Sequence, residues 1–367
     1  MPAKLFEPLT IRGVSFRNRV AMSPMCMHSA TADGFASDFH VVHYGSRALG
    51  GAGLVMLETA AVLPNGVLGP GDIGIWSDGH IDGLRRIAHA IQQFGARAGV
   101  QIGHAGRQVD APHLPAVAPS AVPWGPDSRI PEALTLAGID EVVEAFRDAA
   151  RRATSAGFDV VEVHTAHGYL LNQFLSPLAN QRTDEYGGTH ENRYRIVRRV
   201  LDAVREEWTG PLFVRLSSTD YAKGGNTPDD MVVFARWMKE QGVDLIDASS
   251  GGVAPVRVQS YPNYQVPAGE KIRREVNIPT GAVGLIQTGR QAEEIIQNGR
   301  ADLVFVGREM LKDPFWARTA ADDVREPIEP PKQYTRYGSA WLRTQPPVPA
   351  APMADTVAEP EQAFATV

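Results

Sequence analysis

FDVVEVHTAHGYL, residues 158–170, joins a run with the composition of a buried strand to a polar, turn-forming loop. Three of its first six residues are valine, which favours an extended strand. A helical pattern precedes it over residues 139–156 and ends at Gly157, as a left-handed helix C-cap would. The predicted order of elements is therefore a helix, a glycine, a strand and a polar loop. The same order recurs along the chain.

The whole sequence alternates short apolar runs with longer amphipathic segments. We expect strands at residues 19–24, 53–59, 99–103, 159–163, 212–216, 245–248, 278–281 and 303–307. We expect helices at residues 38–49, 81–94, 139–156, 192–208, 228–241, 268–275 and 290–298, with one more after the last strand. This alternation predicts an α/β protein, a closed (β/α)8 TIM barrel, with an open doubly wound sheet as the competing arrangement.

Three segments lie outside the alternation. Residues 5–19 predict a hairpin that caps the barrel floor, and residues 107–136 are long enough to predict an excursion over the upper face. We expect a single domain over residues 1–343. The Pro/Ala-rich residues 344–367 are expected to be disordered or extended along a neighbour's surface.

Composition and charge exclude several classes of protein. The net charge of the 367 residues is -6 and basic residues are scattered, so nothing favours nucleic-acid binding. The single cysteine, Cys26, excludes an intrachain disulfide and a multi-cysteine metal or iron–sulfur cage. No signal-type core or bilayer-length apolar stretch is present, so the expected setting is cytoplasmic.

A dinucleotide-type motif, Gly-Pro-Gly-Asp-Ile-Gly, occupies residues 69–74. Its usual role requires a tight turn from a strand into a helix, with the pyrophosphate at the helix N-terminus. The nearest predicted strand ends about ten residues earlier, and no apolar helix follows. We interpret the motif as an ordinary Pro–Gly loop, so a nicotinamide nucleotide would bind without a Rossmann domain.

Two imidazoles and a phenol, from His164, His167 and Tyr169, follow the strand at residues 159–163. Ligands of parallel α/β proteins bind where strands end. Two N–H donors can polarise one carbonyl oxygen, and a nearby phenol can supply a proton. The alternative without a functional role is that these three side chains only form hydrogen bonds within the protein. A sharper rival is a metal site built from Glu162, His164 and His167.

Other predicted strand ends also carry candidate site residues. Arg215 would point into the barrel mouth, where a guanidinium suits an anion or an electron-rich ring, although a simple salt bridge is the alternative. Cys26 is either a thiol beside a redox cofactor or a small buried residue. Gly284, Gly307 and Arg308, after the last two strands, are typical of a phosphate cradle.

Together these pieces resemble the old yellow enzyme family of FMN-dependent ene-reductases, over residues 5 to 343. The most specific segments are residues 23–27 (SPMCM), 101–107 (QIGHAGR), 164–169 (HTAHGY) and 182–193 (RTDEYGGTHENR). Cysteine after Pro-Met resembles the thermophilic-like, xenobiotic-reductase-like branch, where it replaces a threonine near the flavin.

The resemblance implies a role for individual residues of this chain. FMN would contact Ser23, Pro24, Met25, Cys26, Ala60, Gln101 and Arg215, with its phosphate on Gly284, Gly307 and Arg308. His164 and His167 match the pair that binds the substrate carbonyl, and Tyr169 matches the proton donor. Arg336 is similar to an arginine that enters the active site of a partner subunit, which implies a homodimer or a dimer-based higher oligomer.

The implied reaction is reduction of an activated C=C bond by hydride from flavin N5, with NADPH or NADH as hydride donor. The substrates would be small α,β-unsaturated carbonyl or nitro compounds, with no metal, nucleic acid or membrane involved. One position departs from the branch, because His28 stands where tyrosine is usual, which affects substrate preference and pH dependence. The competing functions are a metal-dependent hydrolase or lyase and a non-catalytic FMN-binding sensor.

Overall fold

The computed structural model describes residues 2–334, and its centre is a closed barrel of eight parallel strands. Each strand pairs with its neighbours in chain order, and the last strand, β12, closes onto the first, β3. The strands are β3 (Val20–Met22), β4 (Leu54–Ala61), β5 (Arg97–Gly103), β8 (Val160–Thr165), β9 (Leu212–Ser217), β10 (Leu245–Ser249), β11 (Thr280–Ala282) and β12 (Leu303–Val306). The predicted TIM barrel is confirmed, and the open doubly wound sheet is excluded.

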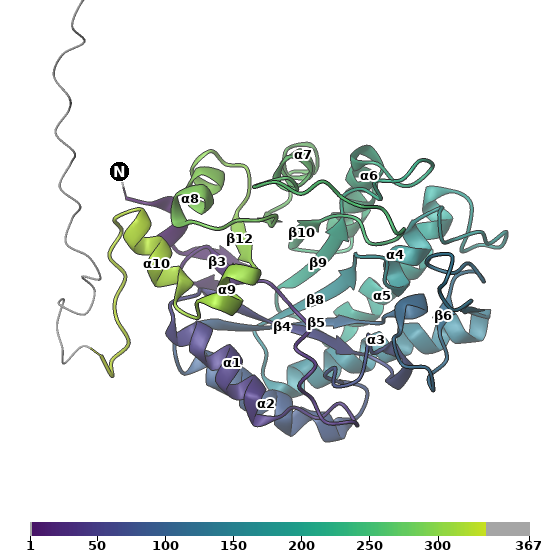
Figure 1. The fold of residues 1–367 in the computed structure, drawn as a ribbon, viewed down its shortest axis with the longest axis horizontal. Helices are drawn as coiled ribbons and strands as arrows, with labels where there is room; N and C mark the ends of the chain where they lie inside the picture. Colours follow the sequence, from purple (N-terminus) through teal and green to yellow (C-terminus); the bar gives the residue numbers. More distant parts are fainter. Residues whose placement is uncertain (1, 335–367) are drawn as a thin grey trace, which may run out of the picture. The chain divides into compact units, whose positions relative to one another are not determined.

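Helices surround the barrel, as Figure 1 shows. They are α1 (Asp38–Leu49), α2 (Ile81–Gln92), α3 (Leu136–Ala156), α4 (Leu170–Leu175), α5 (His190–Glu207), α6 (Pro228–Glu240), α7 (Val266–Val276), α8 (Gly289–Gln297), α9 (Arg308–Lys312) and α10 (Trp316–Asp323). The predicted C-cap at Gly157 is confirmed, with φ at 82°. Helix α3 begins at Leu136, three residues earlier than predicted, because the side chain of Thr135 caps it by accepting from the backbone N–H of Gly138. The prediction missed this first turn because it lies outside the apolar periodicity of the helix.

The N-terminal hairpin closes one end of the barrel. Strands β1 (Leu9–Ile11) and β2 (Val14–Phe16) pair antiparallel, as predicted. Phe16 is fully buried, and its ring centroid lies 6.5 Å from that of Phe213, with the two rings tilted at 36°. The hairpin therefore supplies apolar side chains to the lower core of the barrel, where Leu54, Met56 and Phe305 also pack.

The inward side chains change from apolar to polar toward the carboxyl ends of the strands. On β8 the inward series is Val160, Glu162 and His164, because side chains two apart share a face. Phe213 is followed in the same way by Arg215, and Leu245 by Asp247. A polar layer therefore lies above the apolar core, where the catalytic face of a TIM barrel is found.

The long segment after β5 contains a short helical turn, η4 (Gly106–Gln108), and a two-stranded sheet of β6 (Val117–Ala118) and β7 (Glu132–Ala133). Its predicted excursion lies beside the loop after β8, since Gln108 Nε2 donates to His167 O at 2.9 Å. The Gly69–Gly74 motif opens no helix, and Gly74 instead bridges Ala61 of β4.

The contacts within the chain separate a unit of Met1–Ile328 from a second unit, Glu329–Val367. The barrel and the site residues described below belong to the first unit. The predicted domain boundary at residue 343, the Pro/Ala-rich tail and Arg336 lie outside the described residues. Within residues 2–334, no helix is long and apolar enough to cross a membrane.

Candidate active site

The rings of His164, His167 and Tyr169 meet at the end of β8. The centroid of the His164 ring lies 5.1 Å from that of His167 and 5.0 Å from that of Tyr169, and the rings are nearly perpendicular. His167 has φ at 59° and Gly168 at 73°, so the chain turns sharply in the left-handed region at the second imidazole, directly before Tyr169. The structure therefore brings together the three side chains that follow this strand in the sequence.

Both imidazoles are neutral at physiological pH. Burial and the positive charge of Arg215 lower the pKa of His167 to about 3. Burial, His167 and Arg215 hold the pKa of His164 well below its ordinary value. The backbone N–H of Ala166 donates to His164 Nδ1 at 3.2 Å, so the ring proton of neutral His164 sits on Nε2. His164 can therefore donate one hydrogen bond without carrying charge.

His167 is positioned by residues that sequence patterns did not indicate. Its Nε2 lies 2.6 Å from Ser249 Oγ, and its backbone N–H donates to Ser217 Oγ at 2.9 Å. Gln265 Nε2 donates to Ser249 Oγ at 3.2 Å, which fixes the serine hydroxyl. Ser249 ends β10, so the same strand-end reasoning would have found it, whereas Gln265 comes from a loop without any motif.

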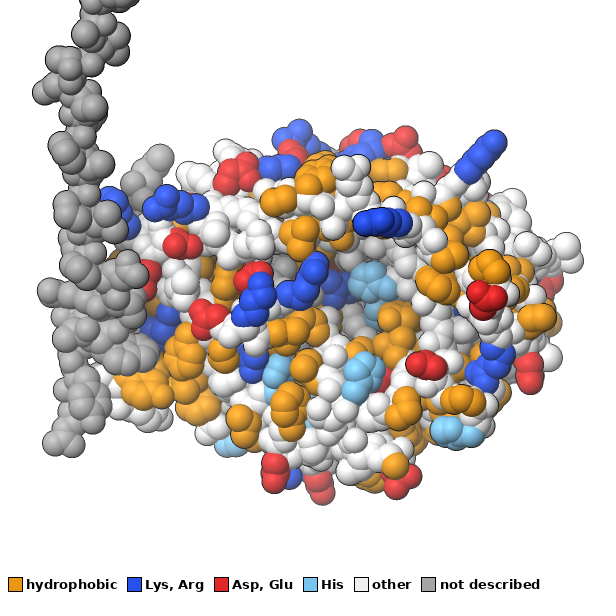
Figure 2. All heavy atoms as spheres, in the orientation of Figure 1, with side chains coloured by type: hydrophobic (Ala, Val, Ile, Leu, Met, Phe, Trp, Pro, Cys, Tyr) orange, Lys and Arg blue, Asp and Glu red, His pale blue; other side chains and the backbone are white. Residues whose placement is uncertain are grey.

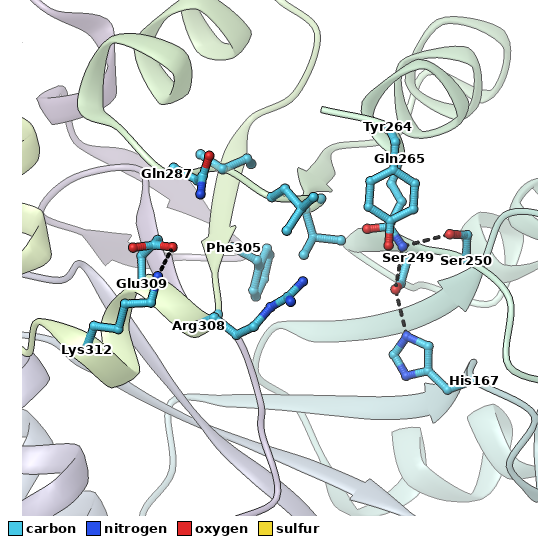
Figure 3. A pocket seen from close by; sticks show the side chains of 15 residues that line it. His167, Ser249, Ser250, Tyr264, Gln265, Gln287, Phe305, Arg308, Glu309 and Lys312 are labelled. Atoms are coloured by element: carbon cyan, nitrogen blue, oxygen red, sulfur yellow. Dashed lines mark hydrogen bonds and ion pairs between the residues drawn. The ribbon is translucent and has the colours of Figure 1, made fainter. Parts of the chain in front are cut away.

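A cavity of about 420 Å³ opens beside His167 and runs toward the ends of β11 and β12. Figure 3 shows Arg308 extending into it, with Tyr264, Gln265 and Ser249 opposite. Gly284 and Gly307 form part of its wall, so the structure brings together the three residues predicted to hold a phosphate. Gly284 has φ at 123°, and an added Cβ would lie 3.2 Å from Gln265 atoms, so a side chain is disfavoured there.

Arg215 lies between the polar layer of the barrel and the loop after β3. Its Nη2 donates to Ser23 Oγ at 3.0 Å and its Nη1 to Pro24 O at 3.5 Å. Its Nε lies 3.2 Å from Asp247 Oδ2, and both side chains are buried. Three predicted cofactor residues therefore meet, and the salt bridge that was the alternative for Arg215 is also present.

The remaining predicted cofactor residues occupy different surroundings. Met25 Sδ lies 3.5 Å from where a Cβ on Gly307 would stand, so the loop after β3 adjoins the cavity wall. Gln101 is buried and donates to Glu162 Oε1 at 2.7 Å. Ala60 packs in the apolar layer between strands and helices, so a cofactor contact there would involve its backbone.

Cys26 lies beside two carboxylates. One possible metal-binding atom from each of Cys26, Glu58 and Asp72 lies within 4.8 Å of the other two. This group of side chains differs from the rival metal site of Glu162, His164 and His167. Glu58 accepts from Tyr44 Oη and from the backbone N–H of Met27, so its oxygens are already occupied.

We predict that Cys26 is a poor nucleophile. Burial raises the pKa of its thiol, and the charges of Asp72 and Glu58 raise it further. Iodoacetamide at pH 8 should alkylate the native protein at least about tenfold more slowly than the urea-unfolded chain, because each pKa unit lowers the thiolate fraction about tenfold. Mass spectrometry of timed aliquots measures this, and equal rates would contradict it.

His28 contacts a carboxylate at the rim of this group. Its Nδ1 lies 2.8 Å from Asp72 Oδ1, and its side chain is 54% exposed while that of Asp72 is 2% exposed. Asp72 also accepts from the backbone N–H groups of Leu68 and Gly69. The imidazole that replaces the branch's tyrosine is therefore anchored by a buried carboxylate, a partner that sequence spacing did not reveal.

The family model described as NADH:flavin oxidoreductase / NADH oxidase matches residues 4–326 of this chain. The chain belongs to this family. An NADPH dehydrogenase of Geobacillus sp. (strain WCH70) is 53% identical to it over 337 residues, 92% of this chain and 99% of that protein. The family contains the old yellow enzymes, so the predicted relationship is confirmed, and the protein is an FMN-dependent, nicotinamide-nucleotide-linked oxidoreductase.

Solved structures of family members share the barrel. Morphinone reductase matches with a TM-score of 0.76 at 29% identity, over 91% of this chain and 93% of the reductase. The old yellow enzyme homologue from Zymomonas mobilis matches with a TM-score of 0.75 at 26% identity, over 89% of this chain and 94% of that one.

The residues at the barrel mouth fit FMN. The cavity beside Gly284, Gly307 and Arg308 suits a phosphate, since it combines glycine backbone with a cation. Arg215 and Ser23 present polar groups to the central part of the site, where a ring system with electronegative atoms would lie. Figure 2 shows histidine and Lys/Arg side chains gathered around the hollow of this face. Bound FMN supplies a two-electron centre that accepts hydride from a nicotinamide nucleotide and returns it to an acceptor.

Proposed function

We propose that the chain reduces the C=C bond of α,β-unsaturated carbonyl or nitro compounds with NAD(P)H. The observation that supports this most is the cluster of His164, His167 and Tyr169 at the end of β8, beside the cavity that fits FMN. A relative of known structure is named morphinone reductase, which is consistent with a reductive role for such a site.

In this proposal, His164 and His167 bind the activating oxygen of the substrate. Both imidazoles are neutral, and His164 presents its Nε2 proton because its Nδ1 accepts from the backbone N–H of Ala166. His167 is proposed to donate from Nδ1, with its Nε2 accepting from the hydroxyl of Ser249. As negative charge grows on the substrate oxygen, these hydrogen bonds strengthen, so the pair stabilises the transition state more than the bound substrate. Ser249 holds His167 in the required orientation.

Tyr169 is the proposed proton donor to the α-carbon. Its ring lies 5.0 Å from that of His164. Burial raises the pKa of its phenol, and the charge of Asp72 raises it further, so the hydroxyl keeps its proton throughout the neutral range. A protonated phenol next to the carbonyl-binding pair can complete the addition of hydrogen across the double bond.

His28 is proposed to contact the substrate, anchored by Asp72. Ser23, Pro24, Met25, Cys26, Ala60, Gln101 and Arg215 are proposed to contact the flavin. The homodimer, the entry of Arg336 into a partner's site and a cytoplasmic location also stay predictions.

The test is anaerobic stopped-flow absorbance of the purified protein. The proposal expects a yellow protein whose flavin band is bleached by NADPH or NADH and restored by cyclohexenone. A yellow protein that either fails to bleach or fails to be restored by a panel of activated alkenes would support a sensor instead. A colourless protein with bound zinc would support the metal-dependent alternative.

Replacing Tyr169 by phenylalanine should slow reoxidation by cyclohexenone about 10²–10⁴-fold, the usual contribution of a general acid. Reduction by NADPH requires no such proton, so its rate should change much less. Stopped-flow measurement of the two half-reactions separates these effects. If Tyr169→Phe slowed both half-reactions equally, Tyr169 would be acting by packing and the proposed role would be wrong.

A further inference from the structure

Two buried carboxylates share one guanidinium beneath the site. Glu162, Arg215 and Asp247 come from the neighbouring strands β8, β9 and β10, and both carboxylic side chains are fully buried. Arg215 Nε pairs with Asp247 Oδ2 at 3.2 Å. Glu162 is held instead by the amide of Gln101, and among the described residues it forms no ion pair with Arg215.

The charges of this group do not balance if both acids are ionised. One guanidinium can neutralise one carboxylate, and a second buried carboxylate nearby is disfavoured by desolvation and by repulsion. Burial and the charge of Asp247 raise the pKa of Glu162, and burial raises that of Asp247, which Arg215 partly offsets. Within residues 2–334, Glu162 Oε2 and both carboxylate oxygens of Asp247 have no hydrogen-bond partner, so Asp247 is held by its ion pair with Arg215 alone. Glu162 is therefore the neutral acid and Asp247 the paired carboxylate.

Arg215 also faces the place where a flavin ring would bind, through its contacts with Ser23 and Pro24. The guanidinium of Arg215 therefore neutralises Asp247 on one side and would also face any negative charge on a flavin bound on the other side. The other titratable groups near Arg215 are His164, His167, Tyr169 and Tyr264. Both imidazoles stay neutral, and burial raises the pKa of both phenols, so these keep their protons. No second cation is available in this layer among the described residues.

We propose that Asp247 takes up a proton from solvent when the bound flavin is reduced, and releases it on reoxidation. The inference rests on the proposed flavin position. Hydride from NAD(P)H brings two electrons and one proton, and the nucleotide leaves oxidised, so the site gains one negative charge. Arg215 then faces that charge and Asp247 together, and one solvent proton converts the Asp247 carboxylate to the acid. Glu162 keeps its proton in both states, so the net charge of the layer and flavin is unchanged.

The test is reduced-minus-oxidised infrared difference spectroscopy of the FMN-loaded protein, with NADPH or an electrode as reductant. We expect reduction to produce a new carboxylic acid C=O band that shifts in D2O. Asp247→Asn should abolish this band. Glu162→Gln, the matched control in the same layer, should keep it, because Glu162 does not change its protonation.

Labelling the wild-type protein with aspartate that carries carbon-13 in its side-chain carboxyl shows, without any variant, whether the new acid is an aspartate and not Glu162. The new band should then shift to lower frequency. Asp247→Asn then assigns the band to this aspartate and not to the buried Asp72 or Asp220. A wild-type protein that is bleached by NADPH but shows no new acid band would overturn this inference while leaving the proposed function intact. A band that is insensitive to aspartate labelling, or that is lost only in Glu162→Gln, would overturn it as well.

Discussion

The double variant His164→Ala/His167→Ala should reduce cyclohexenone at least about 10²–10³-fold more slowly than the wild type, the usual loss for one oxyanion donor. The reason is that both imidazoles are neutral N–H donors positioned on the same side of the site. Without them, the charge that grows on the substrate oxygen has no donor from β8. The rate constant for reoxidation of the reduced enzyme by cyclohexenone measures this loss.

The control variant is His167→Asn, which keeps an N–H donor in place of the imidazole. It should retain more activity than His167→Ala if hydrogen bonding, and not packing, is the contribution. Thermal unfolding of each variant checks that the barrel is intact. If the double variant reoxidised at the wild-type rate, the assignment of the carbonyl-binding pair would be refuted.

The pH dependence gives an independent check of the same pair. The pKa of His167 is lowered to about 3 and that of His164 lies well below its ordinary value, so neither imidazole gains a proton between pH 8 and pH 5. The rate constant for reoxidation should therefore show no titration step between pH 5 and pH 8 that is caused by these two imidazoles. Any step that is present should be found in the double variant as well. A wild-type step near the ordinary histidine pKa, lost on removing the pair, would mean that the active form is cationic.

The barrel could be predicted from sequence because its signals are local. Most strands are short runs of largely apolar residues, and glycines such as Gly157 mark helix ends directly before strands. His164, His167 and Tyr169 were found for the same reason, since all three lie within one segment after one strand. Their spacing needed only the left-handed turn at His167 and Gly168 to bring the rings together.

The partners of these residues could not be predicted in the same way, because they come from distant segments. Gln265, which fixes Ser249 beside His167, lies in a loop whose sequence carries no motif. Asp72 belongs to a Pro–Gly loop that was interpreted as ordinary, yet it anchors His28. The pairing of Arg215 with Asp247 depends on the register of β9 against β10, which periodicity alone does not set.

Arg215→Met should destabilise the protein by about 3–5 kcal/mol and abolish FMN binding. Removing one member of a buried ion pair leaves an uncompensated charge, and the cost of that charge is of this size. Here the group left behind is Asp247, with Glu162 close by in the same layer. Urea unfolding of the protein without FMN measures the stability, and flavin fluorescence on titration measures the binding.

The decrease in unfolding free energy caused by Arg215→Met should grow as the pH rises. Burial already holds the pKa values of Glu162 and Asp247 above the ordinary carboxyl range, and losing the guanidinium raises that of Asp247 further. A carboxyl with a raised folded-state pKa binds more protons in the folded than in the unfolded state. Its contribution to stability is therefore complete at low pH and is lost as pH rises through the folded-state pKa.

The unfolding free energy of Arg215→Met should accordingly be closer to that of the wild type at pH 5 than at pH 9. Arg308→Met provides the matched comparison, because Arg308 lines the phosphate cavity but is exposed and lies outside the polar layer of the barrel. It should weaken FMN binding with a change in unfolding free energy below about 1 kcal/mol, as is usual for substitutions away from the core. If Arg215→Met were as stable as Arg308→Met at pH 9, Asp247 would not depend on Arg215 for its charge, and the charge balance inferred for this layer would be wrong.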